Sequence, residues 1–173
     1  NYSAILFGEL IMKKAQDGSN SLIQNERRRL LIDATISAIS EHGLSKVTLA
    51  KIAKLAGLTA GSVNFHFDSK ELLLLEALSY LTRELDQSID KAIENAGADP
   101  AAQLLAVFEA SLDPEITEPR KTAVWYAYAS EARTRADYQK ICGAQERKTF
   151  GLILGLCNQI INRGKKNGKM DPR

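Results

Sequence analysis

The stretch that decides the fold is "KIAKLAGLTAGSVNFHF", residues 51–67. It predicts two short helices joined at Gly57, the first carrying Ile52 and Leu55 and the second beginning at Thr59. Two helices joined by a three- to four-residue turn that contains Gly are typical of the helix-turn-helix pattern. In that pattern the second helix enters the major groove of DNA, with its N-terminal residues against base edges. The stretch therefore predicts a DNA-reading helix after Thr59.

The residues around this turn are small, hydroxylated or positively charged, and each type suits a different part of DNA. Small side chains let the helix approach the bases closely, and the Asn64 amide can pair with adenine through two hydrogen bonds. Hydroxyls near helix N-termini suit phosphate oxygens, and lysines add positive charge. We therefore expect the DNA-binding residues to be Thr48, Lys51, Thr59, Ala60, Gly61, Ser62, Asn64, Phe65, His66 and Lys70.

The same residues also allow an interpretation without DNA. Short amphipathic helices around a Gly turn occur in many proteins. In that interpretation Thr48 and Thr59 only cap helices, and Phe65 and Phe67 belong to the core, which is the interpretation we prefer for Phe67. A helical adaptor that binds other proteins then remains as an alternative.

The composition favours an all-α protein, and the absence of readable catalytic motifs favours a protein that is not an enzyme. The 173 residues are 45% hydrophobic, contain four prolines and carry a net charge of +2. There is no readable nucleophile–base pair, carboxylate dyad or Gly-rich phosphate loop, and we expect no cofactor. His42 and His66 lack partners at metal-ligand spacing, so we expect no metal site. Cys142 and Cys157 lie too far apart on one predicted helix for a disulfide, which suits a reducing compartment.

The chain divides near Asp68 into a small three-helix unit and a larger helical unit. Residues 1–24 are predicted to form a flexible leader or extension, residues 25–68 the three-helix unit, and residues 69–173 the larger unit. Residues 13–24 are polar, which indicates a flexible arm. Residues 1–12 are apolar but form a short run without a basic region before it, so we expect a soluble cytoplasmic protein with no membrane partner. The predicted helix boundaries are Gly43, N-caps at Thr48, Thr59, Asp68 or Ser69, and Asp99, a helix start near Pro119, and a last helix from about Asp137 to Gly164.

Residues 26–75 resemble the DNA-binding domain of the TetR family of bacterial repressors. The residues that carry the resemblance are "TLAKIAKLAGLTAGSVNFHF" and "DSKELLL". "RRRLLIDATISAISEHG", residues 27–43, and "WYAYASEA", residues 125–132, are similar to the BetI-like branch of that family, which responds to choline. Most family members have Tyr where this chain has Asn64, so the usual Tyr–phosphate contact does not carry over.

The resemblance implies a ligand-responsive repressor. It implies a homodimer on near-palindromic double-stranded DNA, and an effector-binding and dimerisation domain over residues 69–173. The family usually continues with two further helices that form the dimer interface. The resemblance therefore implies that a sequence ending at Arg173 is truncated.

Aromatic residues in the larger unit suggest where an effector would bind. Trp125 and Tyr128 are spaced i, i+3 and share a helix face, which Tyr126 does not. We expect the ligand-binding residues to be Trp125, Tyr128, Phe108 and Tyr80, with a balancing charge from Glu109 or Glu131. Aromatic faces suit choline or a related quaternary ammonium. Such a pair is also common in a plain core, and a neutral hydrophobic effector remains as an alternative.

Overall fold

The structure is a computed structural model that describes the backbone of residues 2–166 and the side chains of residues 22–166. Within that range it contains seven α-helices, one short 3-10 helix and no strand, which confirms the all-α prediction. The elements are α1 (Tyr2–His42), η1 (Leu44–Lys46), α2 (Leu49–Leu55), α3 (Ala60–His66), α4 (Lys70–Ala96), α5 (Pro100–Ser111), α6 (Pro119–Glu131) and α7 (Ala136–Lys166). In the described part of the chain, no helix is long and apolar enough to cross a membrane.

The helix boundaries follow from local sequence signals, and the predicted caps are confirmed. The side chains of Thr48, Thr59, Ser69 and Asp99 each accept a hydrogen bond from the backbone N–H three residues later, at 3.1–3.3 Å. Each bond satisfies an N–H group that the helix start leaves without a partner. Gly43 ends α1 with a φ of 76°, a conformation that other residues rarely adopt.

The first helix starts earlier than the sequence predicts. The sequence predicts a start near Asn25, after a flexible leader over residues 1–24, but α1 is continuous from Tyr2. Residues 2–24 contain no proline, and Gly8 and Gly18 are their only glycines. A glycine lowers helix stability by about 1 kcal/mol relative to alanine without blocking the helix. Polar composition is therefore a poor reason to expect a flexible arm. Asn1 lies outside the described residues.

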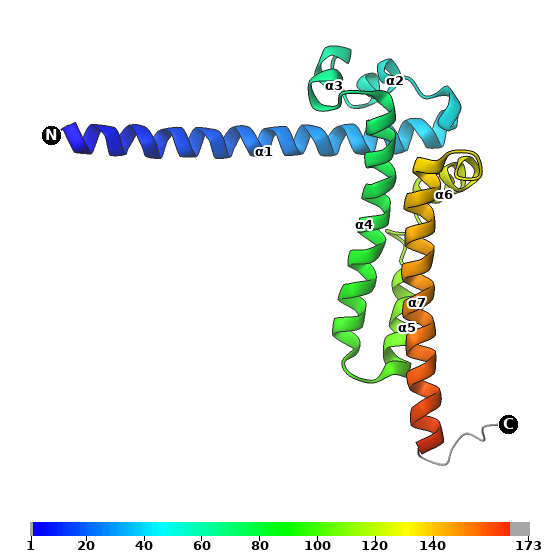
Figure 1. The fold of residues 1–173 in the computed structure, drawn as a ribbon. Helices are drawn as coiled ribbons and strands as arrows, with labels where there is room; N and C mark the ends of the chain where they lie inside the picture. The colour runs from blue at the N-terminus through cyan, green and yellow to red at the C-terminus, as the bar shows by residue number, and fades with distance from the viewer. Residues whose placement is uncertain (1, 167–173) are drawn as a thin grey trace.

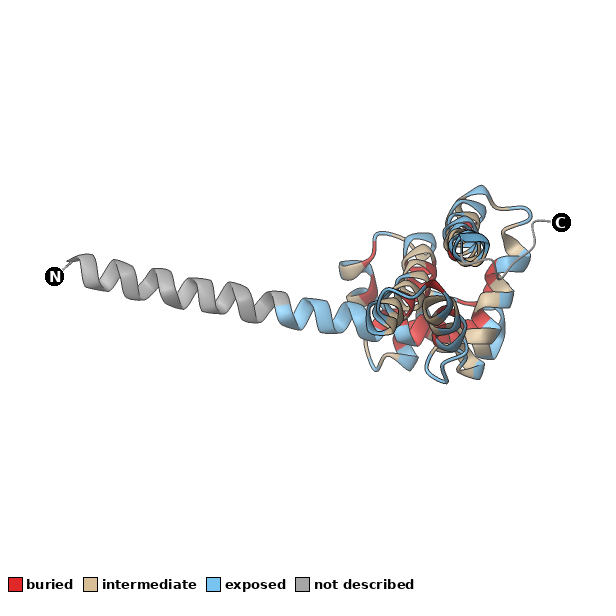
Figure 2. Cartoon of the chain, turned by 90° about the horizontal axis from the view of Figure 1, so that it is seen from below, coloured by how far each residue is buried: buried red, intermediate tan, exposed pale blue. Residues whose placement is uncertain are grey.

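The helices form a small unit at one end and a bundle below it (Figure 1). We call the small unit the reading head, because it contains the helix predicted to read DNA. The head consists of α2 and α3 with the C-terminal half of α1. The long helix α4 leaves the head and packs against α5 and α7, while α6 packs on α1 and η1. Figure 2 shows that buried residues gather where α1 meets the other helices, whereas residues 22–30 are exposed.

Two hydrophobic cores hold this arrangement together. The first joins the head to α6 and to the starts of α4 and α7, with Leu31, Ile52, Val63, Leu74 and Tyr128 among its members. The second lies lower in the bundle and contains Ile89, Val107, Ala110 and Leu156. The first core therefore crosses the boundary predicted at residues 68–69, and the head is not packed as a separate unit.

Tyr128 and Tyr138 are the largest fully buried side chains of the first core, and Tyr128 contacts two other helices. Its hydroxyl donates a 2.6 Å hydrogen bond to the Leu74 carbonyl on α4. Its ring meets Tyr138 on α7 edge to face, with centroids 5.1 Å apart. Burial, reinforced by Tyr138, strongly raises the pKa of the Tyr128 hydroxyl, so the group stays protonated and remains a donor. One residue of α6 thus fixes the position of α4 and α7.

Replacing Tyr128 by Phe should lower the free energy of unfolding by about 1 kcal/mol. That is the typical net contribution of one hydrogen bond, and the ring would keep its packing. Chemical denaturation monitored by circular dichroism measures the change. Tyr126→Phe is the matched control, because the Tyr126 side chain is 74% exposed on the same helix. Equal effects of the two substitutions would contradict a specific role for the Tyr128–Leu74 hydrogen bond.

Candidate DNA-binding surface and effector cavity

The reading helix α3 is fixed to the head by one face and presents the other face to solvent. Val63 is fully buried and Phe67, just after the helix, is 4% exposed, so the core interpretation of Phe67 is confirmed. Phe65 is 73% exposed and does not belong to the core. The helix therefore has a buried face for positioning and a free face for a partner.

Most residues predicted to contact DNA lie on this free surface. Thr48, Thr59, Ala60, Gly61, Asn64 and Phe65 are exposed, while Lys51, Ser62, His66 and Lys70 are half-buried. The structure thus brings the predicted residues to one region, around the starts of α2, α3 and α4. Contact with DNA stays a prediction for each of them.

Lys51 and Lys70 also stabilise the loop before α2. The Lys51 ammonium donates a 3.0 Å hydrogen bond to the Lys46 carbonyl, and the Lys70 ammonium donates a 3.2 Å bond to the Val47 carbonyl. An ammonium has three donors, so one such bond leaves others free for a phosphate. These bonds hold both charges in the region of the residues predicted to contact DNA, which we call the reading surface.

Arg28 has a structural role that the sequence did not suggest. Its guanidinium lies 4.4 Å from the centre of the Phe67 ring and donates to the His66 carbonyl at 3.3 Å. It also approaches Glu76 on α4 to 3.5 Å. Arg28 therefore joins α1, the end of α3 and α4. The basic run "ERRRL" alone could not show which arginine would do so.

His66 is poorly suited to act as a cation toward phosphate. Its Nε2 atom is buried and has no hydrogen-bond partner among the described residues. Burial lowers the pKa of the imidazole, and the charges of Arg27 and Arg28 lower it further. The ring is therefore neutral at pH 7. It instead packs edge to face against Phe65, with centroids 5.2 Å apart.

An open apolar cavity of about 650 Å³ lies between α6 and α7. Its lining includes three aromatic side chains, Trp125, Tyr126 and Phe150. Among the described residues that line it, Glu146 is the only charged one. The volume falls within the range usual for small-molecule sites.

The four residues predicted to bind the effector are not brought together. Trp125 lines the cavity, whereas Tyr128 is buried in the first core. Phe108 is 48% exposed on α5, and Tyr80 lines a separate cavity beside Arg120. Tyr126, which we expected to point elsewhere, shares the cavity with Trp125.

The angular position of each residue on α6 explains this difference. At about 100° per residue, Thr122, Trp125 and Tyr126 fall within one arc of the helix, and that arc faces the cavity. Val124 and Tyr128 occupy the neighbouring arc, which faces the core. Trp125 lies at the edge of the cavity arc nearest Tyr128, so its i, i+3 relation to Tyr128 did not identify the cavity side. Glu109 and Glu131 do not line the cavity either, and the carboxylate there belongs to Glu146.

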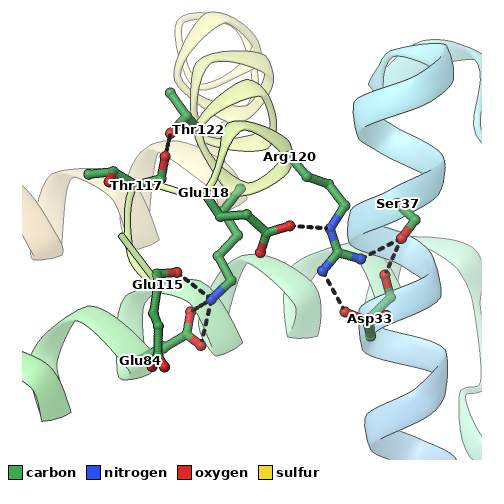
Figure 3. A network of polar contacts seen from close by, with 9 residues as sticks. Asp33, Ser37, Glu84, Glu115, Thr117, Glu118, Arg120 and Thr122 are labelled. Atoms are coloured by element: carbon green, nitrogen blue, oxygen red, sulfur yellow. Dashed lines mark hydrogen bonds and ion pairs between the residues drawn. The ribbon is translucent and has the colours of Figure 1, made fainter. Parts of the chain in front are cut away.

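Polar side chains fasten the start of α6 to α1 and α4 (Figure 3). The Arg120 guanidinium donates to the Ser37 hydroxyl at 2.6 Å and pairs with Asp33 at 3.0 Å, both on α1. Lys121 pairs with both carboxylate oxygens of Glu84 on α4, at 2.7 and 2.8 Å. We call these two sets of contacts the α6 clamp.

The composition of the α6 clamp indicates that it is more than a solvated surface. Positive side chains in the first turn of a helix oppose the helix dipole, so Arg120 and Lys121 do not stabilise α6 by themselves. The Lys121 side chain is only 12% exposed, so solvent screens its pairing with Glu84 less than it would screen a surface pair. No local pattern predicts these partners, because Ser37 and Arg120 are 83 residues apart.

No group of three or more His, Cys, Asp or Glu side chains in the described part of the chain is placed to hold a metal ion. Cys142 and Cys157 are both free and half-buried on α7.

Comparison with known proteins assigns this arrangement to a class. The family model of bacterial regulatory proteins of the tetR family matches residues 31–77. The HTH-type transcriptional regulator BetI of Stenotrophomonas maltophilia is 31% identical over 80% of this chain and 69% of its own length. The chain therefore belongs to the TetR family of DNA-binding transcriptional regulators, and within that family it is BetI-like.

Solved structures share the same fold. A transcriptional regulator from Pseudomonas aeruginosa PAO1 is 26% identical, with a TM-score of 0.72 over 85% of this chain and 69% of that one. The ketosteroid transcriptional regulator KstR2 of Mycobacterium tuberculosis is 25% identical, with a TM-score of 0.67 over 80% of this chain and 69% of that one. The fold is thus shared with transcriptional regulators of other bacteria.

Replacing Lys70 by Ala should weaken binding to every DNA sequence and flatten the slope of log K against log salt by about 0.9. That change is the one expected when a single phosphate is no longer neutralised by the protein. Fluorescence anisotropy over a range of salt concentrations measures the slope. Lys91→Ala is the control, since Lys91 is exposed toward the far end of α4. An unchanged slope for Lys70→Ala would remove Lys70 from the interface.

Proposed function

We propose that this protein is a repressor that releases DNA when a small cationic effector occupies the cavity beside Trp125. The observation that carries the proposal is that α6 has three roles in one helix. It lines the cavity with Trp125 and Tyr126, fills the first core with Tyr128, and fastens to α1 through Arg120. A ligand that moves α6 must therefore alter the packing of the reading head.

The lining of the cavity supports a quaternary ammonium effector such as choline. Trp125, Tyr126 and Phe150 offer aromatic faces, which attract a cation through their negative electrostatic potential. Glu146 supplies a negative charge at the same site. The similarity to BetI points to the same class of ligand. In this proposal Trp125 is the one residue retained from the predicted ligand-binding set.

A neutral hydrophobic effector is the second candidate. The cavity is predominantly apolar, and its volume of about 650 Å³ exceeds what a molecule as small as choline needs. KstR2, which shares the fold, is named a ketosteroid transcriptional regulator. The two candidates differ in one respect that experiment can separate, because only a cation gains from Glu146.

We propose that release of DNA is a population shift between two positions of α6. The effector would favour the position in which the head no longer fits its DNA site. The remaining components are implied by the family. They are a homodimer and a near-palindromic operator whose half-sites lie about 34–36 Å, or a multiple of this, apart.

Choline should quench the fluorescence of Trp125 and weaken operator binding at the same concentrations. Trp125 is the only tryptophan of the chain, so its emission reports on the cavity directly. Glu146→Gln should raise the Kd for choline by up to about fivefold, the value of a solvent-exposed ion pair. It should leave binding of dimethylbutanol, the uncharged isostere of choline, unchanged.

The matched control is Glu131→Gln, since Glu131 is also an acidic residue of this region but does not line the cavity. It should leave both affinities as they are. If choline produced neither quenching nor release while a steroid produced both, the cationic proposal would be wrong and the hydrophobic candidate would replace it.

A further inference from the structure

The outermost ridge of the reading helix consists of Gly61 and Phe65. Val63 is fully buried and marks the inner face of α3. Positions two residues before and two residues after it lie about 200° around a helix, on the opposite side. These positions are Gly61 and Phe65, which stack one turn apart. They are therefore the first residues of α3 to meet a surface that approaches the helix.

Neither the backbone conformation nor the packing of the described residues requires a glycine at Gly61. It does not adopt a positive φ, which in the described residues is found only at Gly43, Gly57 and Gly97. A Cβ atom at Gly61 would meet only the Thr59 hydroxyl oxygen, at an ordinary 3.9 Å. A glycine inside a helix is nevertheless less stable than alanine. Its absence of a side chain therefore matters to something outside the chain that must come close to the backbone.

Phe65 presents an apolar ring beside this bare position. Its side chain is 73% exposed, while its neighbours on the free face are the polar Asn64 and the bare Gly61. The ring of His66 packs edge to face against it. Phenylalanine has no donor or acceptor, so it cannot contact a phosphate or a polar base edge through a hydrogen bond. It gains only by covering another apolar group.

We propose that Phe65 is a specificity-determining residue that covers the C5-methyl group of a thymine in each half-site. The major groove exposes one prominent apolar group, the thymine methyl, and aromatic side chains are among those that contact it. Gly61 lets the helix come near enough for the Phe65 ring to reach that methyl. The proposal rests on α3 being the helix that enters the groove.

The test replaces thymines of the operator by deoxyuridine, which removes only the methyl group. The full-length chain first selects its preferred duplex from random DNA, and each thymine of that duplex is then exchanged in turn. For the wild type, one position in each half-site should lose affinity about fourfold, the value of one buried methyl. For Phe65→Ala the loss at that position should disappear, and for Asn64→Ala it should persist.

Gly61→Ala provides a second variant whose fold is not at risk. Alanine favours the helix and fits the space, so the melting temperature of this variant should not fall. Its affinity for the operator should fall. A deoxyuridine loss that persists in Phe65→Ala, or no loss at any thymine in the wild type, would overturn the proposal. Selection of no sequence at all would instead show that the DNA-binding function itself is wrong.

Discussion

The burial of Tyr128 between α4 and α7 is the constraint on which the rest of the structure depends. Its ring fills the core that also contains Leu31, Ile52 and Val63 of the reading head, and its hydroxyl binds the α4 backbone at Leu74. Close-packed protein interiors do not deform gradually, so a shift of α6 requires its neighbours to repack. The reading head and the bundle consequently behave as parts of one packed body.

The α6 clamp connects α6 to the same neighbouring helices through polar contacts. Arg120 connects the first turn of α6 to α1, and Lys121 connects the same turn to α4. The head contains the C-terminal half of α1, and α4 packs against α1. Because Trp125 and Tyr126 line the cavity, α6 connects the cavity directly to the head.

The predictions that succeeded depended on neighbours in sequence, and those that failed depended on partners far along the chain. Thr48, Thr59 and Asp99 capped helices as expected, because a cap bonds to residues only three positions away. Aromatic spacing on α6 did not show which arc would face the core, so Tyr128 was assigned to a cavity that Tyr126 lines instead. The hydrogen bonds of Arg28 and Arg120 join helices distant in sequence, and no local pattern indicates these bonds. For the leader, polar composition was a weaker signal than the absence of proline.

The central claim is that α6 transmits effector binding to the reading head. The most direct measurement is the factor by which saturating choline weakens operator binding, compared between the wild type and Arg120→Gln. Lys148→Gln serves as control, because it breaks an ion pair with Asp86 that joins α7 to α4 and leaves the α6 clamp intact. Our account predicts that Arg120→Gln still binds choline, as shown by Trp125 quenching, but that the factor falls toward one, while Lys148→Gln keeps it. A factor unchanged in Arg120→Gln would contradict transmission through the α6 clamp.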